Sequence, residues 1–368
     1  MQQGQNSGQG RAGGGTPGKN LCHNFETIIS IDNLLSAWRE FSKGKRNKRD
    51  VQEFERHLMD NLIALHQELK EKMYRHGGYK HFKINDPKPR DIHKASVRDR
   101  LIHHAIYRVL YPYFDRKFTT DSYSCRLNKG THKAIDRFRA FACQVSHNHT
   151  RTTWILKCDI KKFFASINHE ILKQILAKHV SDQSVLWLLG NVVDSFNTQG
   201  KFGVGLPLGN LTSQLLVNIY MNEFDQYVKH KLKVKYYIRY ADDFVFMSHD
   251  RDSLLSLIPQ ISNFLTDQLK LTLHPDKLFL KTLASGLDFL GWVHFPDHRV
   301  LRTSTKRRMF RNLVIGLLSE VNEAKVNSYL GLLGHGNGHK IREEITLQLS
   351  VRDETRLSTG FSELLTKP

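Results

Sequence analysis

The sequence predicts a mixed α/β fold in which a sheet is covered by helices, and three observations support this. Apolar residues recur at helical spacing in several segments, among them 51–65, 97–109 and 252–268. Between these segments lie short β-rich stretches, 153–160 and 236–247. The length of 368 residues is sufficient for two or three subdomains that each bury apolar surface.

The charge balance points to a polyanionic partner. The chain has 55 Lys and Arg against 36 Asp and Glu, which gives a formal net charge of +19. Each phosphate that such a protein neutralises releases condensed counterions, so the excess favours nucleic acid over the alternative of a merely soluble basic protein. No apolar run approaches the roughly 18–20 residues that span a bilayer, and no signal peptide is recognisable. We therefore expect a cytoplasmic protein without a membrane partner.

The first part of the chain predicts a tail followed by helices around an extended segment. Residues 1–20 are rich in Gly, Gln and Ser and predict a disordered tail. A helix is expected over 51–65 and another over 97–109. Between them, residues 79–93 are basic and punctuated by prolines, which predicts an extended conformation.

The second part predicts a sheet with helices between its strands. Residues 153–160 read as a buried strand that ends in a carboxylate, and 236–247 as a hairpin with acids at its turn. The remaining segments predict helices over 169–179, from about 211 and over 252–268, a strand at 289–295, and basic helices from about 300 with a Gly/His-rich break at 334–340.

Three aspartates are candidates for metal-dependent chemistry. Asp159 ends the first strand, and Asp242 and Asp243 occupy the turn of the hairpin. Adjacent strands would bring all three to one edge of a sheet. Phosphoryl transfer to a 3′-hydroxyl uses two divalent ions roughly 3.5–4 Å apart, and magnesium prefers carboxylate oxygens. The spacing therefore predicts a two-metal phosphoryl-transfer site.

The surroundings of the acidic pair distinguish it from an ordinary solvated turn. An isolated acidic pair in a turn is usually structural. Here the flanking residues are apolar and aromatic, among them Tyr237, Phe244 and Phe246. Burying such a segment around unpaired carboxylates is costly unless cations compensate their charge.

These motifs, in this order, resemble those of reverse transcriptases. Residues 240–243 resemble the YxDD box, and Asp159 with its strand resembles the first catalytic motif. The similarity covers about 80–340, with further matches at 88–90, 98–105, 122–135, 206–214, 274–277 and 289–292. It implies a right-hand polymerase with fingers at 21–150, palm at 151–298 and thumb at 299–368.

The resemblance assigns roles at the catalytic centre. It implies RNA-directed DNA synthesis from deoxynucleoside triphosphates with two Mg²⁺ ions, on a template RNA and a primer or cDNA strand. Asp159, Asp242 and Asp243 would be the catalytic metal ligands, and Ile160 would offer only its backbone carbonyl. Lys277 takes the place of a lysine near the leaving pyrophosphate, where it could donate a proton, although a solvated lysine is the alternative.

Other residues take positions that contact the nucleotide in this family. Phe164, five residues after Asp159, occupies the position of an aromatic gate against a 2′-hydroxyl. Its neighbour Phe163 leaves the alternative that Phe164 belongs to the core. Lys88 and Arg90 resemble the fingers contacts to the triphosphate. Two further arginines compete for that role, namely Arg98 and Arg100.

One box points to a subgroup. Most reverse transcriptases carry Gln-Gly-x-x-x-Ser-Pro there, whereas this chain has Leu208, Gly209, Ser213 and Gln214 in the corresponding places. This version resembles the enzymes of diversity-generating retroelements, which copy template RNA into adenine-mutagenised cDNA. Replacing an amide by Leu208 removes a hydrogen bond worth about 0.5–1.5 kcal/mol, which would loosen discrimination. Neutral drift in the box is the alternative.

The basic region after residue 300 is a candidate for holding primer and template. Lys306, Arg307, Arg308 and Arg311 lie within one predicted helix. They would clamp the duplex through its phosphates, unless they form an ordinary solvated face.

The sequence is also compatible with two other functions. A retron-like or phage-defence reverse transcriptase would use the same active site for a different biological role. A non-catalytic nucleic-acid-binding scaffold would not use the site at all. The retroelement family also implies a small, basic, helical accessory protein as a partner.

Overall fold

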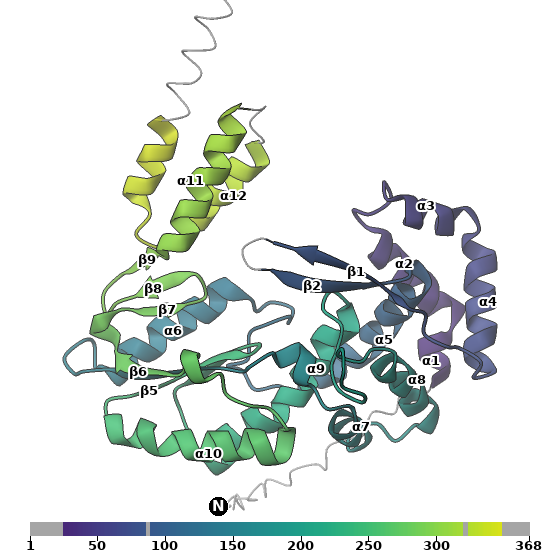
Figure 1. Cartoon of the computed structure of the whole chain (residues 1–368), viewed down its shortest axis with the longest axis horizontal. Helices are drawn as coiled ribbons and strands as arrows, with labels where there is room; N and C mark the ends of the chain where they lie inside the picture. Colours follow the sequence, from purple (N-terminus) through teal and green to yellow (C-terminus); the bar gives the residue numbers. More distant parts are fainter. Residues whose placement is uncertain (1–24, 86–88, 319–322, 348–368) are drawn as a thin grey trace, which may run out of the picture. The chain divides into compact units, whose positions relative to one another are not determined.

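The computed structural model describes residues 25–85, 89–318 and 323–347, which form two compact units (Figure 1). The first unit contains the described residues up to Tyr113 together with His169–Phe196, and the second contains Phe114–Asn168 and the described residues from Asn197 onward. The predicted tail lies outside the described ranges. Within these ranges no helix combines the length and the apolar character needed to cross a membrane.

The first unit consists of helices and one antiparallel hairpin. Its hairpin pairs Tyr79 with Ala95 and Ile84 with Arg90, so the segment predicted to be extended is confirmed as two strands. The helix predicted over 51–65 is interrupted at His57, whose φ and ψ are −120° and 40°. The elements are α1 (Phe25–Ile29), α2 (Ile31–Ser42), α3 (Arg49–Arg56), α4 (Leu58–Lys70), β1 (Tyr79–Ile84), β2 (Arg90–Ala95), most of α5 (Val97–Asp115), α7 (His169–Ala177) and α8 (Gln183–Asp194).

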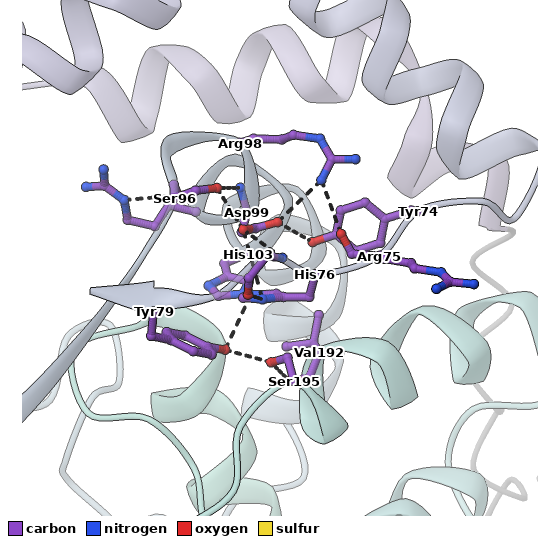
Figure 2. Close-up of polar contacts among 12 residues, drawn as sticks. Tyr74, Arg75, His76, Tyr79, Ser96, Arg98, Asp99, His103, Val192 and Ser195 are labelled. Atoms are coloured by element: carbon purple, nitrogen blue, oxygen red, sulfur yellow. Dashed lines mark hydrogen bonds and ion pairs between the residues drawn. The ribbon is translucent and has the colours of Figure 1, made fainter. Parts of the chain in front are cut away.

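A buried carboxylate anchors the loop that leads into β1 (Figure 2). Asp99 of α5 is 1% exposed and accepts hydrogen bonds from the Tyr74 hydroxyl at 2.9 Å, the Ser96 hydroxyl at 2.7 Å and the Gly77 amide at 3.1 Å. Three donors compensate the loss of water around this group. The network therefore fixes where β1 begins relative to α5.

The second unit is built on a four-stranded antiparallel sheet of order β4-β5-β3-β6. The strands predicted at 153–160 and 236–247 and the helices predicted at about 211 and over 252–268 are confirmed. The elements are α6 (Thr131–Val145), β3 (Trp154–Asp159), α9 (Leu211–Gln226), β4 (Tyr237–Tyr240), β5 (Asp243–Ser248), α10 (Arg251–Leu269), β6 (Phe279–Thr282), β7 (Leu287–Phe289), β8 (Trp292–His294), β9 (Arg299–Leu301), α11 (Thr303–Leu318) and α12 (Glu323–Leu333).

Helices lie on both faces of the sheet (Figure 1), and successive side chains of a strand point to opposite faces. On one face, Ile155, Val245 and Met247 pack in a cluster with residues of α6. On the other face, Phe244 lies against Phe224 of α9, with ring centroids 5.1 Å apart. The alternation follows the period of two that a strand covered on both faces requires.

A buried ion pair holds the β4–β5 turn. Arg239 and Asp225 are both fully buried, and the guanidinium donates to the carboxylate through Nε at 2.8 Å and Nη2 at 2.7 Å. Arg239 also donates from Nη1 to the Ala241 carbonyl at 3.1 Å. Ala241 has a φ of +57°, in the left-handed region. The pair therefore ties the turn residue before Asp242 to helix α9.

The segment predicted as one strand at 289–295 is instead two strands. β7 and β8 pair as a hairpin whose turn residues, Leu290 and Gly291, have φ of 52° and 89°. The prediction was wrong because the segment is a nearly continuous apolar run, and a single glycine within it was too weak a signal of a turn. Trp292, the first residue of β8, packs with Met309 and Leu333 and so joins the β7–β9 sheet to α11 and α12.

We predict that Asp225→Asn strongly destabilises the protein. The substitution leaves Arg239 charged and without its counterion in the interior, which typically costs about 3–5 kcal/mol. Urea denaturation measures the loss. Asp252→Asn removes a carboxylate that is 86% exposed and serves as the control, with an expected change within about 0.5 kcal/mol. A loss for Asp225→Asn no larger than that of the control would contradict the role given to the pair.

Candidate active site

The register of the sheet brings two of the candidate aspartates together. Asp159 and Asp243 are direct partners across β3 and β5, and directly opposed residues have Cβ atoms about 4.5–5.5 Å apart. Like charges in this arrangement repel. The site therefore needs positive charge close to both carboxylates.

Two lysines of the same unit supply positive charge. The Lys277 ammonium lies 2.8 Å from Asp159 Oδ1. The Lys157 ammonium lies 3.3 Å from Asp243 Oδ2 and also donates to the Asp288 carbonyl at 2.7 Å. Lys157 precedes Asp159 by two residues on β3, so both side chains emerge from the same face of the sheet.

The Asp243 carboxylate is held in a partly desolvated position. Its Oδ1 atom is buried and has no hydrogen-bond partner, although the side chain as a whole is 22% exposed. Burial raises the pKa of Asp243 to about 6; the charge of Lys157 opposes this shift, and the nearby Asp159 and Asp242 carboxylates add to it. An ionised oxygen without a donor is suited to a cation as its partner.

The donor set fits a hard divalent cation. Asp159 and Asp243 present carboxylate oxygens, which magnesium prefers. Asp242 lies in the turn, where its carbonyl accepts the Ile160 amide at 3.3 Å. Ile160 itself is 1% exposed. Across the described residues, no three His, Cys, Asp or Glu side chains converge as a ready ligand group. The assignment of Asp159, Ile160, Asp242 and Asp243 as metal ligands therefore remains a prediction.

The segment after β3 carries the two adjacent phenylalanines in different environments. Phe163 and Phe164 belong to a 3₁₀ turn, Phe163–Ser166. Phe163 is 3% exposed and belongs to the core, whereas Phe164 is only partly buried. The Phe164 carbonyl accepts the Leu206 amide at 2.8 Å, which ties the turn to the segment that leads into 208–214. Phe164 is thus the ring of the pair that remains accessible.

The predicted nucleotide box lies at the start of α9. Gly209 is exposed and has a φ of +102°, a conformation that favours glycine. Leu208 and Gln214 are partly buried, and Ser213 is 2% exposed in the first turn of the helix. Leu208, Gly209 and Gln214 can therefore be reached from solvent, whereas the Ser213 side chain cannot.

The candidate fingers residues differ in their partners. Lys88 lies outside the described residues. Arg90 begins β2 and is exposed. The two rivals for its role are committed to acids of the first unit, since Arg98 forms an ion pair with Glu68 (Figure 2 shows its contact with the Asp99 network) and Arg100 lies 2.8 Å from Asp50. Among Arg90, Arg98 and Arg100, Arg90 is therefore the arginine whose exposure suits contact with a nucleotide phosphate.

The candidate cations of the thumb lie on α11. Arg307 and Arg311 are exposed one turn apart, and Met309 is fully buried between them in sequence. Lys306 and Arg308 are partly buried, and the Lys306 ammonium lies 5.5 Å from the Phe310 ring centroid. The helix thus presents a basic face to solvent and an apolar face to the core.

Sequence reasoning missed three residues that shape the site: Lys157, Arg239 and Asp225. The position of Lys157, two residues before Asp159 in a strand, could have revealed it through the period of two. The buried pair of Arg239 and Asp225 had no such signal, because the two residues lie in different elements.

Comparisons with known proteins concern the family and the fold of the chain. A family model described as reverse transcriptase (RNA-dependent DNA polymerase) matches residues 82–294. That range includes all four strands of the central sheet and more than half of the chain.

Individual relatives share part of their length with this chain. It is 27% identical over 248 residues to protein YkfC of Escherichia coli, covering 57% of this chain and 63% of YkfC. It is 26% identical to the retron Ec83 reverse transcriptase of Escherichia coli, covering 50% of this chain and 62% of that protein. The chain thus spans less than two thirds of either relative.

A solved structure supports the fold. The structure of telomerase from Candida albicans, in complex with the TWJ fragment of telomeric RNA, has a TM-score of 0.50 at 11% identity and covers 76% of this chain and 55% of that one. This similarity confirms the predicted right-hand polymerase fold and concerns the fold alone. Because the family model matches more than half of its residues, the chain belongs to the reverse transcriptase (RNA-dependent DNA polymerase) family.

Proposed function

We propose that the protein is an RNA-directed DNA polymerase whose catalytic carboxylates are Asp159, Asp242 and Asp243. The observation that carries this proposal is the cross-strand pairing of Asp159 with Asp243, whose Oδ1 is buried without a donor. Such an arrangement supports binding of two magnesium ions by carboxylates and nucleotide phosphates. In this proposal, 21–150 act as fingers, 151–298 as palm and 299–368 as thumb.

The residues of the chain act mainly by positioning and by charge. Bound magnesium would supply activation of the primer hydroxyl and neutralisation of the triphosphate. Asp159 and Asp243 fix where those charges gather, on two strands held in register. Lys277, whose ammonium lies 2.8 Å from Asp159, would donate a proton to the leaving pyrophosphate. Arg90 and Lys88 contact the triphosphate.

Selection of the sugar and holding of the strands complete the proposal. The Phe164 ring would exclude ribonucleotides by contact with the 2′-hydroxyl, so that the product is DNA. Its partial exposure beside the buried Phe163 supports this role. The cations of α11 hold the primer–template phosphates; these are Lys306, Arg307, Arg308 and Arg311.

Within the family, we assign the chain to the diversity-generating retroelement group. The assignment rests on the box at the start of α9, where Leu208 replaces an amide and Gln214 replaces a proline. Gly209 and Ser213 complete the box. The activity would be error-prone copying of template RNA into cDNA, together with a small basic helical accessory protein.

A retron-like or phage-defence enzyme is the second candidate, favoured by the similarity to the retron Ec83 reverse transcriptase. The neighbouring DNA separates the two, since a template and variable repeat pair marks a retroelement and a structured non-coding RNA marks a retron.

We predict that Asp242→Asn combined with Asp243→Asn abolishes DNA synthesis and leaves RNA affinity nearly unchanged. The carboxylates hold metal, whereas affinity comes from phosphate contacts elsewhere. Primer extension and RNA binding on the same preparation measure the two effects. Residual synthesis within about tenfold of wild type, a barrier change of only about 1.4 kcal/mol, would refute the site and favour a non-catalytic scaffold.

We predict that Leu208→Gln lowers misincorporation opposite template adenines. A restored hydrogen bond of about 0.5–1.5 kcal/mol changes discrimination up to roughly tenfold. Sequencing of cDNA made on one template, with any accessory protein supplied, gives the error at each base. Leu208→Met, which keeps an apolar side chain, is the matched control and should retain the errors. Uniformly low error at all four bases in wild type would remove the retroelement assignment.

A further inference from the structure

A basic cavity lies in the first unit, between the end of α2 and the start of α3. Its volume is about 490 Å³. Three of its wall residues carry positive charge and none carries negative charge, so the wall attracts an anion. The wall consists of Arg39, Ser42, Lys43, Gly44, Arg46 and Asn47.

A buried hydroxyl without a partner points independently to a ligand. Ser42 is 1% exposed, and its Oγ atom has no hydrogen-bond partner within the protein. Leaving such a group unsatisfied costs stability. Because Ser42 lines the cavity, an acceptor atom of a bound anion would satisfy the hydroxyl.

The cations of the wall are not needed to compensate neighbouring groups. At the end of α2, the Lys45 ammonium donates to the Phe41 carbonyl at 2.8 Å. Lys45 thus satisfies a carbonyl of the last turn, and it is not one of the wall residues. Asp50 already lies 2.6 Å from Lys94 and 2.8 Å from Arg100. The wall residue Arg46 lies 3.5 Å from Glu55, which is outside the wall. Because the Arg46 side chain is 69% exposed, solvent screens this contact.

The shape of the turn keeps the cavity open. Gly44 has a φ of +70°, which favours glycine, and no atom lies within 4 Å of the position that a Cβ would take. The wall also contains no aromatic ring on which a base could stack. Cations and a hydroxyl donor recognise phosphate oxygens and carry no sequence information.

We propose that this cavity binds a backbone phosphate of single-stranded nucleic acid, which is the template RNA if the proposed function holds. It would give the protein sequence-independent affinity for the strand at a position outside the catalytic unit. The Ser42 hydroxyl donates to a phosphate oxygen, and Lys43, Arg39 and Arg46 neutralise its charge.

The test measures binding of a labelled oligouridylate of about 20 nucleotides to the full chain at several salt concentrations. Lys43→Gln with Arg46→Gln should reduce the slope of log affinity against log salt by about 0.7 for each phosphate that the protein no longer neutralises. Arg56→Gln with Lys70→Gln removes the same charge from exposed helical positions of the same unit and should change the slope less. An equal reduction in both double variants would overturn the proposal.

Ser42→Ala separates binding from folding. Because the hydroxyl has no partner in the protein, its removal should leave the melting temperature unchanged or higher, while RNA affinity falls about threefold, as expected when one hydrogen bond is removed. A lower melting temperature with unchanged affinity would show that the hydroxyl is structural and would refute the site.

The binding assay contains no deoxynucleotides and so does not depend on polymerisation. Absence of primer extension by wild type would refute the proposed function alone. Normal primer extension with unaltered RNA binding in the cavity variants would refute this inference alone.

Discussion

The pairing of β3 with β5 is the constraint on which the rest of the site depends. It places Asp159 opposite Asp243, and two like charges at this spacing oppose the pairing that brings them together. The surrounding residues compensate them only in part, because Lys157 and Lys277 each reach one oxygen and Asp243 Oδ1 is left without a donor. Burial is the main reason that the pKa of Asp243 is raised, and the nearby Asp159 and Asp242 carboxylates add to the shift. A bound cation would offset the repulsion between the two carboxylates.

The second constraint is the buried pair of Arg239 and Asp225. A buried ion pair often contributes little net stability, because desolvation offsets the attraction. Its contribution here is geometric, since the same guanidinium holds the Ala241 carbonyl of the turn. The Tyr237 hydroxyl donates to Asp225 at 2.7 Å and adds a contact from β4. The turn is thereby tied to α9, the helix that begins with the predicted nucleotide box.

Local patterns predicted much of the fold and failed where distant residues decide the structure. The hairpin and its acids follow from β-rich sequence around residues 242–243, and α10 follows from the apolar residues at helical spacing over 252–268. The partners of Arg98 and Arg100 depend on contacts between separate segments, and the turn at Leu290 and Gly291 lies within an apolar run that only one glycine interrupts. Proximity of Asp159 to Asp243 was predictable, because one strand ends and the other begins with a carboxylate. The position of Lys157 two residues before Asp159 places both side chains on one face of β3, whereas its contact with Asp243 follows from the register of β3 and β5.

Thermal unfolding of wild type and Asp243→Asn, with and without magnesium, tests the central claim most directly. A carboxyl whose pKa is about 6 when folded and about 3.9 when unfolded lowers stability as pH rises through that interval. At about pH 8 without magnesium, Asp243→Asn should therefore be more stable than wild type, by about 1–3 kcal/mol. Magnesium should raise the melting temperature of wild type and leave that of the variant nearly unchanged. A destabilised variant, or an equal response of both proteins to magnesium, would contradict the account.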